Sequence, residues 1–126
     1  MSGKNGGGFP AGYLRAVLTG AAEGCPEAAW LQSAAGHGLT EEGRAEEALA
    51  FDRRAAELEP ADALRRYNLG CTLALTGATE AALDELEEAV ELGYSDAEWM
   101  EEDDDLAAVR GTARYRKLLA RISGSD

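Results

Sequence analysis

Many pairs of identical residues stand 34 positions apart in the middle of this chain of 126 residues. Seven of these pairs are Gly36 and Gly70, Leu39 and Leu73, Gly43 and Gly77, Ala48 and Ala82, Leu49 and Leu83, Ala55 and Ala89, and Leu58 and Leu92. One spacing that matches so many glycine, alanine and leucine positions predicts a repeated structural unit. Arrays of such units present extended binding surfaces, so the spacing favours a binding protein over an enzyme.

Apolar residues recur with the period of a helix along most of the chain, and no segment alternates in the manner of a strand. The fold class is therefore predicted to be all-α. Short helices should form within about 95–110, and a last helix should run from Thr112 to about 122. Glycine and proline divide the preceding pattern into longer helices, expected at about 10–23, 27–42, 45–59, 63–76 and 80–92.

After Gly93 the register of the repeat is lost, and capping residues have to place the helix ends. Ser95 and Glu98 have the spacing of a capping box, which predicts that Ser95 is the N-cap of the next helix. Gly111 is expected to end a short helix in the left-handed conformation. Thr112 then starts the last helix.

Pairs of helices that are joined by a glycine turn, closed by proline and repeated at this spacing resemble the tetratricopeptide repeat family. The matching residues are Gly36, Leu39, Ala48, Ala55 and Pro60 in the first repeat, and Leu69, Gly70, Leu73, Ala82, Leu86 and Ala89 in the second. Three kinds of position depart from the family pattern. Gln32 and Arg66 stand in place of Trp, Asp52 in place of Phe (with Phe51 one residue earlier), and Tyr94 in place of the second closing Pro.

The resemblance implies a right-handed α-solenoid of about six to seven helices, built as one domain over 10–122. Its alignment divides the chain into a flexible glycine-rich N-terminus (1–9), a half repeat (10–28), a first repeat (29–62), a second repeat (63–96), C-terminal capping helices (97–122) and a tail (123–126).

In this family the first helix of each pair lines a concave groove, so the resemblance implies that a peptide or helix binds there. The implied groove residues are Trp30, Ser33, His37, Leu64, Tyr67, Asn68, Cys71 and Leu75. Alternatively, the C-terminal cap or the N-terminal helix of the chain itself fills the groove. The family's carboxylate clamp is not expected, because only Asn68 matches it. Trp30 and Trp99 are interpreted as packing anchors rather than ligand platforms.

The formal net charge of -12 argues against binding to nucleic acid or to an anionic membrane surface. Thirteen acidic and no basic residues lie from Glu80 to Asp105, and five basic and no acidic residues lie from Arg110 to Arg121. One interpretation is that the acids cover solvated helix faces and that the last helix folds back to offset them. The other is that the acidic surface recruits a basic partner.

Residues that could carry chemistry are few. His37 is the only histidine, and neither Cys25 nor Cys71 belongs to a CxxC pair or a His/Cys cluster, so we expect two reduced, partly buried thiols. The acidic run at 101–105 lacks the ligand spacing of a calcium loop. We therefore expect no catalytic residues, no cofactor and no metal.

No stretch of the sequence has the pattern of a signal peptide or approaches the ~18 apolar residues of a membrane span, so we expect a cytoplasmic protein. The favoured function is a non-catalytic interaction module that binds a peptide or helix of a partner protein. Two alternatives stay open. One is a small acidic chaperone of the same family, and the other is a structural scaffold in which the incomplete N-terminal repeat pairs with its copy in a homodimer.

Overall fold

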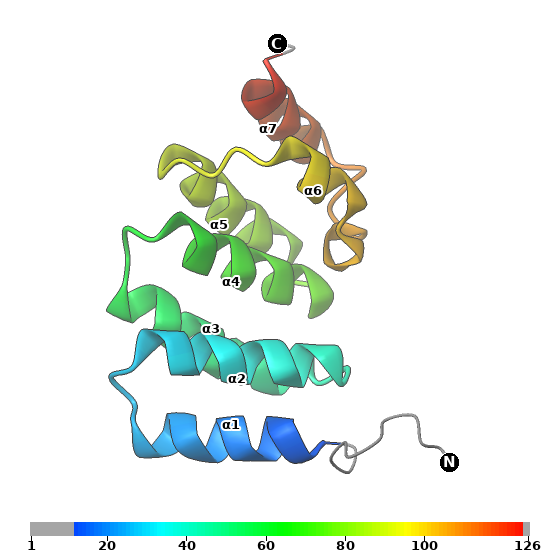
Figure 1. Ribbon diagram of the computed structural model, residues 1–126. Helices are drawn as coiled ribbons and strands as arrows, with labels where there is room; N and C mark the ends of the chain where they lie inside the picture. Colours follow the sequence, from blue (N-terminus) through cyan, green and yellow to red (C-terminus); the bar gives the residue numbers. More distant parts are fainter. Residues whose placement is uncertain (1–11, 125–126) are drawn as a thin grey trace.

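The computed structural model describes residues 12–124, and all the regular structure within them is helical (Figure 1). The helices are α1 (Tyr13–Gly24), α2 (Ala29–Glu41), α3 (Ala45–Leu58), α4 (Ala63–Leu75), α5 (Thr79–Glu91), α6 (Ala97–Glu102), the 3₁₀ helix η1 (Asp104–Leu106) and α7 (Ala113–Ser123). The all-α prediction is confirmed for these residues. None of their helices has the length and apolar character needed to cross a bilayer. The predictions for 1–9, Pro10 and the end of the tail fall outside the described residues.

The helices stack in chain order from α1 at one end to α7 at the other (Figure 1). The α2/α3 and α4/α5 pairs are antiparallel hairpins that lie side by side, because α3 also packs against α4. Helix α4 begins at Ala63, 34 residues after α2 begins at Ala29. Helix α5 begins at Thr79, also 34 residues after α3 begins at Ala45. The spacing found in the sequence is therefore also the spacing of the two hairpins.

The turns inside the two hairpins have the same geometry. Gly43 and Gly77 have φ angles of 77° and 87°, a left-handed conformation that glycine adopts without steric cost. The residue after each glycine donates its backbone N–H back into the helix, from Arg44 to the Leu39 carbonyl at 2.8 Å and from Ala78 to the Leu73 carbonyl at 3.0 Å. These bonds satisfy carbonyls at the helix end that would otherwise lack a partner.

The hydrophobic core is unequally divided along the stack. A small cluster joins α1 to α2 through Ala22, Leu31 and Ala35. Gln32, which stands at the Trp position of the family pattern, is buried there and donates to the carbonyls of Ala22 at 2.8 Å and Cys25 at 3.2 Å. The larger cluster runs from α3 to α7, and its most buried members include Leu83, Leu86, Met100, Leu106, Val109 and Tyr115.

The C-terminal elements differ from two of the capping predictions. Asp96, not Ser95, is the N-cap of α6, because its carboxylate accepts the Trp99 N–H at 3.0 Å. Gly111 does not take a left-handed conformation, since right-handed turns continue from η1 up to Thr112 and leave no helix end for it to close. Thr112 does start the last helix, and its hydroxyl accepts the Tyr115 N–H at 3.1 Å.

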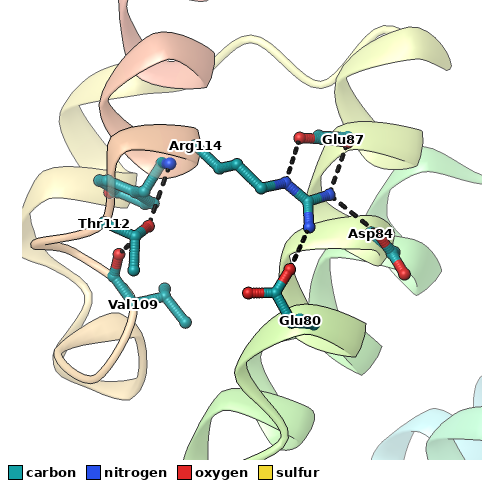
Figure 2. A network of polar contacts seen from close by, with 7 residues as sticks. Glu80, Asp84, Glu87, Val109, Thr112 and Arg114 are labelled. Atoms are coloured by element: carbon teal, nitrogen blue, oxygen red, sulfur yellow. Dashed lines mark hydrogen bonds and ion pairs between the residues drawn. The ribbon is translucent and has the colours of Figure 1, made fainter.

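Helix α7 folds back onto α5 and offsets its acidic face (Figure 2). The Arg114 guanidinium lies 2.7 Å from Glu80, 2.8 Å from Asp84 and 2.8 Å from Glu87. Hydrogen bonds to these acids raise the pKa of Arg114 further. The interpretation that the last helix neutralises the acidic run is thus confirmed for α5.

Candidate functional site

The predicted groove residues of α2 and α4 do not form one continuous open surface. On α2, Trp30 is 65% exposed and His37 is exposed, whereas Ser33 between them is buried. On α4, Leu64 and Leu75 are exposed at the two ends of the helix. The residues between those ends are Tyr67 and Cys71, which are buried, and Asn68, which is half-buried and donates to the Ser33 hydroxyl at 3.5 Å.

The segment at η1 covers the middle of α4. The Tyr67 hydroxyl donates to Asp103 at 2.6 Å, and the Cys71 thiol lies 3.6 Å from the same carboxylate oxygen. The ring of Tyr94 stacks on Tyr67 with the ring centroids 4.4 Å apart, which gives a role to the residue that replaces the closing proline of the family pattern. The chain's own C-terminal segment therefore covers Tyr67 and Cys71, two of the predicted groove residues.

Arg110 and Tyr115 hold this segment in shape. The Arg110 guanidinium donates to the backbone carbonyls of Asp103 at 2.6 Å and Met100 at 3.0 Å, and the Tyr115 hydroxyl donates to the Met100 carbonyl at 2.9 Å. These bonds hold the backbone of the covering segment. The segment is therefore fixed by Arg110 and Tyr115 as well as by its contacts with α4.

A polar pocket of about 140 Å³ remains between α2, α4 and the covering segment. Its lining carries three carboxylates, those of Asp52, Asp103 and Asp105, and a single basic side chain, that of His37. The other lining residues are Ser33, Thr40, Tyr67, Asn68, Cys71, Thr72 and Trp99. The structure thus joins five of the predicted groove residues with acids from α3 and η1 that the sequence analysis did not assign to the site.

Asp52 of α3 is the least expected member of this pocket. It is 4% exposed, and its carboxylate accepts the Thr72 hydroxyl at 2.6 Å. The carboxylate also lies against Gly36 of α2, where an added Cβ atom would overlap it. Burial raises the pKa of Asp52 to about 7, and the Thr72 hydrogen bond and His37 oppose that rise.

Burial also raises the pKa values of Cys71, Tyr67 and Asp105. For Cys71 the carboxylate of Asp103 adds to the effect, so the thiol is held in its protonated form and is not an activated nucleophile. The exposed ring of His37 pairs with Glu41 at 3.2 Å rather than with this thiol. The described residues of the pocket offer no nucleophile and base held together in the manner of a covalent catalyst.

Cys71, Asp103 and Asp105 are the one group in the described residues with the spacing of metal ligands. Their ligand atoms lie within 4.8 Å of one another. One oxygen of Asp103 already accepts from Tyr67 and Cys71, and the other accepts the Asp105 N–H at 3.0 Å. These contacts give the group a structural role in docking η1 on α4. Sequence spacing did not reveal it, because Cys71 and Asp103 come from distant segments.

Two interpretations of single residues are wrong. Trp30 and Trp99 are not packing anchors, since they are 65% and 52% exposed. Cys25 is exposed rather than partly buried, although both cysteines are free as expected. The two exposed indoles leave apolar surface beside the polar pocket, and Trp99 forms part of its lining.

The surface around α6 and η1 keeps its negative charge. Glu98, Glu101, Glu102 and Asp104 are exposed, and no ion pair reaches them within residues 12–124. Arg114 and Arg121 of α7 pair instead with acids of α5. The acidic run is therefore partly offset on α5 and left without ion pairs on the exposed acids of α6 and η1.

No protein-family model and no curated protein matches this chain.

Proposed function

We propose that this chain is a non-catalytic interaction module, a tetratricopeptide-like solenoid that binds a peptide or helix of a partner protein. The matched hairpins and their matched glycine turns, which recur at one spacing, support the architecture. The proposed binding surface is the part of the groove that η1 leaves open, formed by the first turns of α2 and α4 and by the exposed indole of α6.

The observation that carries this proposal is a set of three exposed large apolar side chains beside one polar pocket. Trp30 and Leu64 occupy equivalent positions in the two hairpins and are 65% and 52% exposed. Trp99, also 52% exposed, borders the pocket itself. Exposed aromatic and aliphatic anchors next to polar groups are the usual composition of a binding hot spot.

The charge around these anchors favours a basic partner segment. Asp52, Asp103 and Asp105 line the pocket, and the exposed acids of α6 and η1 are close in the chain to the lining residues Trp99, Asp103 and Asp105. A lysine or arginine in the partner would find acceptors there, and opposite charge would speed its association at low salt. The apolar anchors would then supply most of the affinity, and the acids most of the selectivity.

Selection of peptides from a displayed random library on the purified protein tests the proposal directly. Selected peptides should combine apolar residues with lysine or arginine. Trp30→Ala and Leu64→Ala should each weaken their binding by about tenfold or more, measured by fluorescence polarisation. Leu58→Ala on α3 is the matched control, because Leu58 is 39% exposed but lies outside the proposed surface. Equal losses in all three variants, or no selected peptide, would contradict the proposal.

A further inference from the structure

Helix α1 exposes an apolar face at the free end of the stack. It packs mainly against α2, and no described element lies on its other side (Figure 1). Ala22 is buried toward α2, whereas Tyr13, Leu14 and Val17 are 46%, 58% and 48% exposed. Three large apolar side chains are thus gathered on one helix of twelve residues.

The exposed face of α1 has large residues at one end and small residues at the other. At about 100° per residue, Tyr13, Val17, Gly20 and Gly24 fall on one line of the helix, opposite the buried Ala22. A Cβ atom added at Gly20 or Gly24 would meet no other atom within 4 Å. This line therefore has bulk in its first turns and an open, shallow surface in its last turns.

We propose that the chain forms a homodimer in which α1 packs antiparallel against α1 of a second copy. A two-fold axis at the middle of the helix places Tyr13 opposite Gly24 of the other copy and Val17 opposite Gly20 of the other copy. Both pairings belong to the same register, so a single rotation satisfies all four contacts. A surface that is complementary to itself in this way is what a two-fold dimer requires.

Charge also favours a second copy as the occupant of this face. The line from Tyr13 to Gly24 carries no charge, and Arg15 is turned away from it toward Glu42, 3.1 Å away. Two copies that each carry a net charge of -12 repel one another least where they meet through an uncharged face. Added salt screens the remaining repulsion, so it should strengthen this dimer.

The inference is independent of the proposed binding groove. The line on α1 lies opposite Ala22, which is buried toward α2, whereas the proposed binding surface is formed by α2, α4 and α6. A dimer joined at α1 would therefore carry two separate grooves. Loss of dimerisation would leave the groove proposal standing, and a failed peptide selection would leave the dimer standing.

Sedimentation velocity on the full chain, from about 5 to about 500 μM, measures the association. A pair of twelve-residue helices makes a small interface, so we expect a monomer at the low end and a dimer at the high end of this range. The dimer fraction should rise when salt is added. A monomer throughout the range would overturn the proposal, whatever else covers the face.

Two variants test the interface itself. Val17→Glu places a charge on the line, and Gly20→Gln blocks the close approach of Val17 from the other copy without adding charge. Each should raise the dissociation constant by about tenfold or more without lowering the thermal midpoint. Leu58→Glu is the control, since Leu58 is 39% exposed on α3 and lies outside both proposed surfaces, and it should dimerise normally. Unchanged dimerisation of the first two variants, or equal loss in the control, would overturn the assignment of the interface.

Discussion

In the α4/α5 hairpin an apolar side chain fills the closest approach of the two helices, whereas in the α2/α3 hairpin a carboxylate does. An added Cβ atom at Gly70 would lie 3.0 Å from Leu86. At the equivalent place in the preceding repeat, Gly36 faces the carboxylate of Asp52. Both glycines are therefore needed for close packing, but they make room for opposite kinds of side chain.

The contact between α2 and α3 beside the pocket is therefore expected to be less stable than the equivalent contact between α4 and α5. Leu86 is 1% exposed and belongs to the larger core cluster. Asp52 is almost as buried, yet it has to be satisfied by the hydroxyl of Thr72 from the next hairpin. A buried carboxyl where the second hairpin has leucine departs from the apolar packing of that hairpin, and such exceptions gather at functional sites.

The largest loss of stability is expected when Leu86 of the second hairpin is replaced by aspartate, the residue found at the equivalent position of the first hairpin. Leu86→Asp would bury a carboxyl among apolar side chains, without the hydroxyl that serves Asp52. We expect a loss of about 4 kcal/mol or more in the free energy of unfolding at neutral pH, measured by urea denaturation. Leu75→Asp is the control, because Leu75 is 42% exposed and should change stability little. A loss below about 1 kcal/mol for Leu86→Asp would mean that the two interfaces are equally tolerant of charge.

The next largest effect concerns the buried carboxyl of Asp52 in the first hairpin, whose contribution to stability depends on pH. Because the pKa of Asp52 is raised from 3.8 to about 7, its protonated form is favoured in the folded state. Its contribution to stability is therefore complete below about pH 4 and is lost as the pH rises through about 7. A pKa difference of this size corresponds to roughly 4 kcal/mol across this window.

Asp52→Asn keeps the shape of the side chain and cannot ionise. Its stability should match the wild type near pH 4 and exceed it by up to a few kcal/mol near pH 8, measured by urea denaturation at both pH values. Glu57→Gln removes an exposed carboxylate from the same helix and should follow the wild type at both. If Asp52→Asn shows the same pH dependence as the wild type, folding does not raise the pKa of Asp52.

The two hairpins α2/α3 and α4/α5 were predictable because their signals are local. Glycines such as Gly43 and Gly77 mark turns that depend on a few neighbouring residues, and helix starts such as Ala63 lie within about one to two residues of the expected positions. Capping at Ser95 was displaced to Asp96, because adjacent residues can both cap and tertiary contacts decide between them.

The pocket was only partly predictable because its bonds join distant segments. Tyr67 and Asp103 are 36 residues apart, and Asp52 and Thr72 are 20 residues apart. Asp52 was visible in the sequence as a departure from the repeat pattern. Its hydrogen bond depends on how the first hairpin stacks on the second, which no local pattern encodes. The departure itself was the signal that could have identified the site.

The smallest effect concerns the outer faces of the two hairpins. Helix α3 carries its own basic residues, Arg53 and Arg54, whereas α5 has none and depends on Arg114 from α7 (Figure 2). Arg114→Gln should lower the midpoint of urea denaturation only slightly, because its partners are exposed and screened by water. The loss should shrink further at high salt.

Arg116→Gln is the matched control for this last substitution. Arg116 is exposed on the same helix, and no ion pair joins it to another residue between 12 and 124. Both variants remove one positive charge from an acidic protein, so their difference isolates the contacts of Arg114 from the change in net charge. Equal losses would show that α7 offsets the acids of α5 only through its overall charge. A larger, salt-sensitive loss in Arg114→Gln would show that the contacts of Arg114 with Glu80, Asp84 and Glu87 hold the last helix in place (Figure 2).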